Sequence, residues 1–125
     1  MGAALKNSIK QAKRDKQVLA IAVFGSYARG EHYRDIDVCV FLTPRTYSEQ
    51  ELSLKKMEYV LEDEKYDVQI FQQLPLYIRK RILKEAKILY CRDEGELYDL
   101  YFEAIRDFDH FQHIYEGYLE AVEHG

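Results

Sequence analysis

One stretch of the sequence combines a glycine–serine pair with two closely spaced aspartates. Gly25 and Ser26 follow the apolar run Val18–Phe24, so backbone N–H groups can approach an anion where glycine has no Cβ in the way. Asp35 and Asp37 open the next apolar run, and their spacing puts both carboxylates on one side of a strand. Such a pair favours Mg²⁺, which binds one or two carboxylates together with substrate phosphates. The pattern predicts phosphoryl or nucleotidyl transfer.

A third acid opens a later strand. Asp67 begins the predicted strand 67–71. If this strand lies beside the strand predicted for residues 35–42, Asp67 comes close to the first two aspartates. Three carboxylates could then hold two metal ions, with the third carboxylate near an attacking hydroxyl. An ordinary acid at the start of a strand is the alternative interpretation of Asp67.

The elements that must position these residues alternate between helix and strand. Hydrophobic periodicity predicts strands over 18–24, 35–42, 67–71 and 88–91, and helices over 5–16, from Ser48, after Pro75 and over 94–123. This order predicts an α/β (α+β) fold, in which a small mixed sheet of about four strands packs against helices. We expect residues 1–125 to form a single domain.

Two of these helices carry further signals. Ser48 and Glu51 have the spacing of a capping box, and we expect the helix to turn its apolar side chains inward, namely Leu52, Leu54, Met57, Val60 and Leu61. The long helix 94–123 is acidic and rich in aromatic residues. A small sheet covers only part of so wide an apolar stripe, so this helix is a predicted interface.

Charge is unevenly distributed along the chain. The net charge is −4, but residues 79–92 carry six basic residues and one glutamate, whereas residues 93–125 carry ten acids and one arginine. The acidic end argues against direct nucleic-acid binding there. No apolar stretch approaches the length of a membrane span, and no signal peptide is evident. We therefore expect a cytoplasmic protein in which Cys39 and Cys91 are reduced thiols.

The segment GSYARGEHYRDIDV, residues 25–38, resembles the signature of the DNA polymerase β-like nucleotidyltransferase superfamily, and most closely that of the minimal nucleotidyltransferases, the MNT group. That signature is Gly-Ser, then Ala-Arg-Gly, a spacer and Asp-x-Asp. Chain length and element order fit as well, so the resemblance covers nearly the whole chain.

The resemblance implies roles for individual residues. Gly25 and Ser26 would hold the β- and γ-phosphates of the nucleotide, and Arg29, at the arginine position of the motif, joins this nucleotide-binding set. The implied reaction is attack on the α-phosphate of ATP, release of pyrophosphate and transfer of AMP.

The same resemblance assigns the carboxylates to a two-metal site. Asp35 and Asp37 would bind Mg²⁺ ions, and Asp67 would complete the second metal site and help activate the acceptor hydroxyl. One departure is the spacer: eight residues separate Ser26 from Asp35, and Arg34 replaces the usual serine. A shorter spacer either tightens the loop or moves Ser26 away from the carboxylates, which would weaken catalysis.

The resemblance also implies a partner. Minimal nucleotidyltransferases are often the antitoxin half of a pair with a HEPN-domain ribonuclease toxin, and AMP transfer to a toxin tyrosine blocks RNA cleavage. The first alternative is a catalytically silent protein that neutralises a basic partner by binding through helix 94–123. Transfer to a small molecule and assembly into a homo-oligomer stay open as further alternatives.

Overall fold

The computed structural model describes residues 2–32 and 34–124, without the side chains of residues 115, 118, 123 and 124. Within these residues one sheet has the strand order β3–β2–β1–β4. β1 pairs antiparallel with β2 and with β4, and β2 pairs parallel with β3. The sheet is therefore mixed, as the sequence predicts. Its strands are β1 (Val18–Phe24), β2 (Ile36–Leu42), β3 (Tyr66–Ile70) and β4 (Lys87–Cys91).

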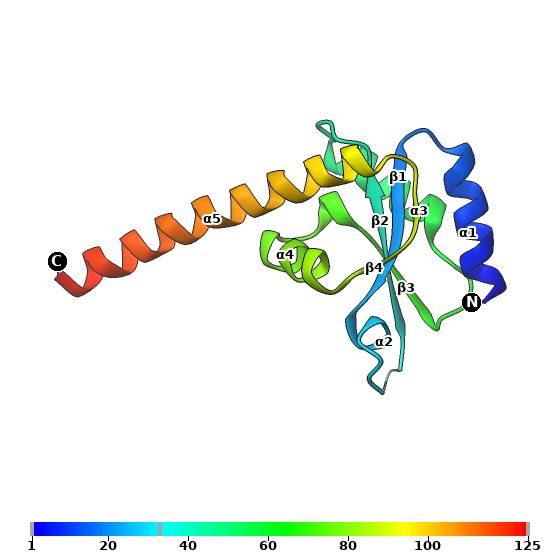
Figure 1. Ribbon diagram of the computed structural model, residues 1–125, viewed down its shortest axis with the longest axis horizontal. Helices are drawn as coiled ribbons and strands as arrows, with labels where there is room; N and C mark the ends of the chain where they lie inside the picture. The colour runs from blue at the N-terminus through cyan, green and yellow to red at the C-terminus, as the bar shows by residue number, and fades with distance from the viewer. Residues whose placement is uncertain (1, 33, 125) are drawn as a thin grey trace.

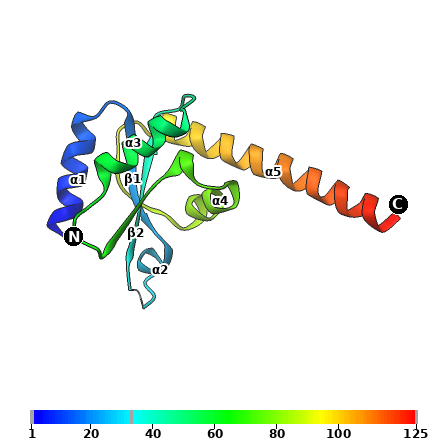
Figure 2. The same ribbon diagram turned by 180° about the vertical axis from the view of Figure 1, so that it is seen from behind.

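Helices cover both faces of the sheet. The two ribbon views place α1 and α3 on one side, α4 and the start of α5 on the other, and the single turn α2 at one end of the sheet (Figures 1 and 2). A 3₁₀ turn over Phe71–Gln73 follows β3. This arrangement confirms the predicted α/β fold. The helices are α1 (Ala3–Arg14), α2 (Gly25–Ala28), α3 (Glu49–Tyr59), α4 (Leu76–Glu85) and α5 (Glu94–His124).

The strand β1 contributes to two separate cores. Val18, Ile21 and Val23 pack with the core on the α1/α3 face, whereas Leu19 and Ala20 both belong to the core on the α4/α5 face. Alternation along a strand forbids two successive residues on one face. The ladder with β2 shifts register between Val18 and Ala20, and this irregularity restores the alternation.

The capping box of α3 is present as predicted. The Glu51 backbone N–H donates to Ser48 Oγ at 3.1 Å, and the Ser48 N–H donates to Glu51 Oε2 at 2.8 Å. The predicted inner face of this helix is largely wrong. Leu52 is buried, but Leu54 and Met57 are 61% and 72% exposed, and Val60 is exposed as well. Leu61 only packs partly against the core.

Lys55 and Tyr59 occupy the inward side of α3, which the sequence predicts for apolar residues, and both contact Asp15 just beyond the end of α1. Lys55 Nζ lies 2.9 Å from Asp15 Oδ2, and the Tyr59 hydroxyl donates to the same oxygen at 3.0 Å. Arg92 donates to the backbone oxygens of Asp15 and Ala12. A buried lysine needs an ionic partner. The contact with Asp15 therefore explains why Lys55 is buried while apolar neighbours on α3 are exposed.

The long helix α5 begins at Glu94 and packs on the sheet near its start. Leu100 and Ala104 are buried in the core of the α4/α5 face, and Leu97 and Tyr101 pack against that core. Beyond them the helix runs away from the sheet (Figure 1). In the described part of the chain, no helix has both the length and the apolar character that a membrane crossing requires. Cys39 and Cys91 are free thiols.

The contact between Asp15 and Lys55 generates a stability prediction. Burial by itself raises the pKa of Asp15, but hydrogen bonds from Lys55, Gln17 and Tyr59 outweigh it and lower that pKa. Replacing Asp15 by alanine should therefore reduce the unfolding free energy at pH 7 by about 2 kcal/mol, since a charge-assisted acceptor is lost. Urea denaturation measures this difference.

The pH dependence of that difference has a defined sign. Because the folded pKa of Asp15 is lowered, its contribution is present above the ordinary aspartate pKa of about 4 and is lost as the pH falls through the folded value. The wild-type advantage should shrink below about pH 4. The exposed Glu64→Ala variant is the control, and a difference that persists in acid would contradict the assignment.

Candidate active site

Three chain segments meet at one end of the sheet, where α2 lies (Figure 1). β1 ends at Phe24, whose partner in β2 is Asp37. In the parallel ladder with β3, the partner of Asp37 is Asp67. The central strand thus places one carboxylate between the turn that follows β1 and the carboxylate on β3. The predicted proximity of Asp37 and Asp67 therefore follows from the register of the sheet.

Gly25 lies directly against the Asp37 carboxylate in a backbone conformation that favours glycine. Its φ angle is +73°, and a Cβ added to it would lie 2.4 Å from Asp37 Oδ2. A side chain would suffer both the left-handed backbone and this overlap. The turn closes through the Arg29 N–H, which donates to Gly25 O, and the Glu31 N–H, which donates to Ser26 O. The backbone of the turn therefore lies directly against a carboxylate.

The three aspartates form a site with unbalanced negative charge. Asp37 is half-buried, and Asp35 and Asp67 are exposed. Burial, then the charge of Asp67 and then that of Asp35 raise the pKa of Asp37, while Arg29 acts in the opposite direction. All the donors are carboxylate oxygens at the exposed end of a sheet, which is the chemistry that a hard divalent cation such as Mg²⁺ requires.

These carboxylates do not form a closed cage. Among the residues that the structure describes, no three His, Cys, Asp or Glu side chains gather closely enough to hold a metal ion. Gln69, on the same strand, donates from Nε2 to Asp67 Oδ1 at 3.2 Å, so one oxygen of Asp67 already has a partner. Like charges separate unless a cation lies between them, so the donor set fits Mg²⁺ by its chemistry rather than by preformed geometry.

The side chain of Arg29 points to two carboxylates. Its Nε and Nη2 donate to both oxygens of Glu31, at 2.9 and 3.1 Å, and its Nη1 donates to Glu85 Oε2 at 2.5 Å. These hydrogen bonds raise the pKa of the guanidinium further above its ordinary value. Sequence reasoning missed Glu85, because it lies 56 residues away in a run that is otherwise basic.

Most of the basic residues at the start of α4 have structural partners. Arg79 donates to the backbone oxygens of Leu74 and Gln72. Lys80 Nζ lies 3.8 Å from the centre of the Phe108 ring, and Arg81 pairs with Glu85 at 3.1 Å. These side chains hold α4 in place and link it to α5.

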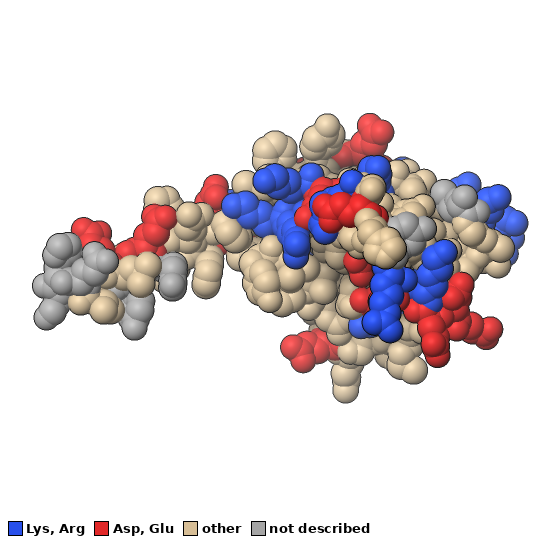
Figure 3. All heavy atoms as spheres, turned by 90° about the horizontal axis from the view of Figure 1, so that it is seen from below, with Lys and Arg blue, Asp and Glu red and all other residues tan. Residues whose placement is uncertain are grey.

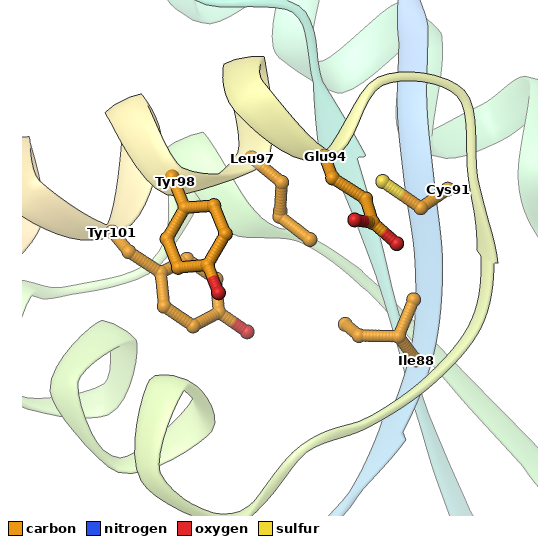
Figure 4. A pocket seen from close by; sticks show the side chains of 6 residues that line it. All are labelled: Ile88, Cys91, Glu94, Leu97, Tyr98 and Tyr101. Carbon is orange, nitrogen blue, oxygen red and sulfur yellow. The ribbon is translucent and has the colours of Figure 1, made fainter.

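A separate hollow of about 290 Å³ lies between β4 and α5. In Figure 4, the Cys91 thiol and the Glu94 carboxylate lie at one end of it, and the rings of Tyr98 and Tyr101 lie at the other. None of the predicted site residues lines this hollow. Ile88 and Leu97 make its lining mainly apolar, which suits contact with another protein better than phosphate chemistry.

The sequence of this chain matches one family of known proteins over most of its length. The model of the family described as "Polymerase beta, Nucleotidyltransferase" matches residues 6–95. A protein of Methanocaldococcus jannaschii, provisionally named a protein adenylyltransferase, is 38% identical over 90 residues. That match covers 70% of this chain and 66% of the relative, just under two thirds of its length.

Two solved structures share the fold. A chain of a toxin–antitoxin crystal structure with AMP-PNP has a TM-score of 0.63 at 20% identity, and the match covers 94% of this chain and 97% of that one. A chain of the complex of a tri-AMPylated Shewanella oneidensis HEPN toxin with an MNT antitoxin has a TM-score of 0.62 at 18% identity, with 95% and 98% covered. At these identities, the likeness concerns the fold.

The raised pKa of Asp37 generates a prediction about stability and metal binding. Because its ionised form is disfavoured by burial and by the other two aspartates, Asp37→Asn should increase the unfolding free energy at pH 7. For an acid with a raised folded pKa, this gain disappears as the pH falls below the ordinary aspartate pKa of about 4, where the wild-type side chain is neutral in both states. Urea denaturation at pH 7 and pH 3.5 measures the change.

Millimolar Mg²⁺ should reverse the order of the two proteins. The ion stabilises the folded wild type by binding to it, and the asparagine variant should gain less. Equal stabilisation of both proteins by Mg²⁺ would show that Asp37 is not a ligand, and Ca²⁺ at the same concentration tests whether the site prefers the smaller ion.

Proposed function

This chain belongs to the polymerase beta nucleotidyltransferase family, and we propose that it transfers AMP from ATP to a hydroxyl group of a partner protein. The observation that carries the proposal is the contact between Gly25 and Asp37, with Asp67 beside them in register. It puts a turn suited to phosphates against carboxylates suited to Mg²⁺. Residues 1–125 would act as one nucleotidyltransferase domain.

The proposed reaction assigns a task to each residue. Gly25 and Ser26 bind the β- and γ-phosphates, while Asp35, Asp37 and Asp67 hold Mg²⁺, which would neutralise phosphate charge. The acceptor oxygen forms a bond to the α-phosphorus, and the bond from that phosphorus to the bridging oxygen of the β-phosphate breaks. Pyrophosphate leaves, and the exposed Asp67 carboxylate takes up the hydroxyl proton.

We propose a HEPN-type protein as the partner that supplies the acceptor hydroxyl, on the grounds of the relatives and of α5. The Methanocaldococcus jannaschii relative is named for protein adenylylation, and the Shewanella oneidensis complex contains an AMPylated HEPN toxin. Transfer to such a toxin would make this protein an antitoxin. Both names describe AMP transfer to a protein, and they support the proposal of a protein acceptor.

The projecting part of α5 supplies a surface for that partner. The apolar spacing that begins on the sheet with Leu97, Tyr101 and Ala104 continues at intervals of four and three to Phe108 and Phe111. This spacing suits packing against another helix. Beyond residue 104 several large apolar side chains are exposed: Ile105, Phe111, Ile114, Leu119 and Val122.

The charge of this surface favours a basic partner. Seen from below, the projecting helix carries acidic side chains among uncharged ones, and basic side chains gather on the domain beside its base (Figure 3). Asp107, Asp109, Glu116 and Glu120 lie on this part of α5. The same surface favours the second candidate function, in which the protein neutralises a basic partner by contact without transfer.

Removing two proposed metal ligands tests the chemistry. The double variant Asp35→Asn and Asp37→Asn should fold and should lose AMP transfer by roughly a thousandfold or more, because charge stabilisation by the metal is worth several kcal/mol. Intact mass spectrometry of the HEPN partner, after incubation with ATP and Mg²⁺, measures the added AMP.

Each outcome of this test decides between the candidates. Addition of AMP by the wild type alone supports the transferase, and peptide mapping then locates the acceptor. Equal transfer by the double variant would show that the site is wrong. A stable complex without any transfer by the wild type would favour neutralisation by contact.

Charge reversal on α5 tests the partner surface. Changing Glu103, Asp107 and Glu116 together to lysine should weaken the complex with the partner at least about tenfold, and the loss should be largest at low salt. Isothermal titration calorimetry measures the affinity. Reversal of the exposed Glu62 and Glu64, which lie beyond α3, is the control. An unchanged affinity of the α5 variant would show that the acidic side chains of α5 do not contribute to the complex.

A further inference from the structure

The phosphate-binding turn is tied to α4 by one side chain. All three nitrogens of the Arg29 guanidinium donate to carboxylates: Nε and Nη2 to Glu31, and Nη1 to Glu85 Oε2 at 2.5 Å. Hydrogen bonds between two charged groups are the strongest that side chains form. Each of the three guanidinium nitrogens of Arg29 therefore has a carboxylate partner without any nucleotide.

Glu85 is placed to act as an anchor. It lies in the last turn of α4, and its side chain is only 17% exposed. Its second oxygen, Oε1, accepts from Arg81 Nε at 3.1 Å. Both oxygens of this carboxylate are thus used, and its position is fixed from α4 as well as from the turn.

The backbone hydrogen bonds of the turn are short-range, and Ala28 is buried in the core of the α1/α3 face. The Arg29 and Gly30 N–H groups donate to Gly25 O and Tyr27 O, and the Glu31 N–H donates to Ser26 O. Gly30 has a φ of +73°, a conformation that glycine adopts without strain. Against this background, the bond from Arg29 to Glu85 joins the turn to a helix distant in sequence.

We propose that Glu85 is a positioning residue of the nucleotide site: it holds Arg29 toward α4, so that Arg29 braces the Gly25–Ser26 turn and does not bind the triphosphate. This inference rests on the proposed function. If Arg29 turned to the phosphates, it would give up three charge-assisted hydrogen bonds. Glu31 would lose this partner and Glu85 would keep only Arg81, beside a polyanion. Both costs favour the brace.

The brace is tested first without any nucleotide. Hydrogen exchange, read by mass spectrometry, should show faster exchange over residues 25–31 in Glu85→Ala than in the wild type, because local opening becomes easier. Arg81→Ala is the matched comparison: it removes the second partner of Glu85 but keeps the bond to Arg29, so exchange over residues 25–31 should change much less than in Glu85→Ala. Unchanged exchange in Glu85→Ala would overturn the brace, whether or not the protein transfers AMP.

The second measurement separates a brace from a phosphate ligand. Glu85→Ala and Arg29→Ala should each raise the KM for ATP about tenfold, the effect of losing one charge-assisted hydrogen bond, with a smaller change in kcat. The double variant should be no worse than either single variant, since both break the same contact. Glu85→Gln, which keeps an acceptor oxygen, should recover part of the loss.

The opposite pattern would overturn the proposal. If Arg29 were a phosphate ligand that Glu85 competes for, Glu85→Ala would lower the KM for ATP while Arg29→Ala raised it. Additive effects in the double variant would contradict the brace as well. A wild type that transfers no AMP counts against the proposed function alone, since the exchange measurement still decides on the brace.

Discussion

The pairing of β2 with both of its neighbours is the constraint on which the candidate site depends. Because β1 runs antiparallel to β2, the end of β1 meets the beginning of β2, and because β3 runs parallel to β2, Asp37 and Asp67 share one level. Gly25 then approaches Asp37 so closely that a Cβ at this position would displace the Asp37 carboxylate. Burial and the charges of Asp67 and Asp35 together raise the pKa of Asp37, and a cation bound among these acids would offset that cost.

The two faces of the sheet serve different purposes. On one face, α1 and α3 enclose an apolar core and join through Asp15, Lys55 and Tyr59, contacts that stabilise the fold at a distance from the aspartates of the site. On the other face, α4 touches both the turn α2, through Glu85, and the long helix α5, through Lys80 and Phe108. Asp37 and Asp67 alternate with core residues of the first face, so strand geometry directs their carboxylates to the second.

Much of this arrangement could be predicted from local pattern, and the remainder depends on contacts between distant segments. The bounds of β1 agree with the prediction because Val18–Phe24 is a continuous apolar run, and the start of α3 agrees because its capping box is local. The prediction of the inner face of α3 was wrong because the ion pair between Lys55 and the distant Asp15 outweighs apolar periodicity. The partner of Arg29 has the same character: no neighbouring residue signals Glu85. The family resemblance is confirmed, and the roles of the six site residues stay predictions.

The projecting part of α5 also affects how long the protein persists in a cell. A helix of some twenty residues with few tertiary contacts is marginally stable by itself and opens locally with little cost. Proteases cut such segments through their open state, at a rate that follows the open population. A partner that covers the helix would close this route to degradation. Molecules without a partner would then be degraded first. The abundance of the protein would therefore follow the fraction of it that is bound to the partner.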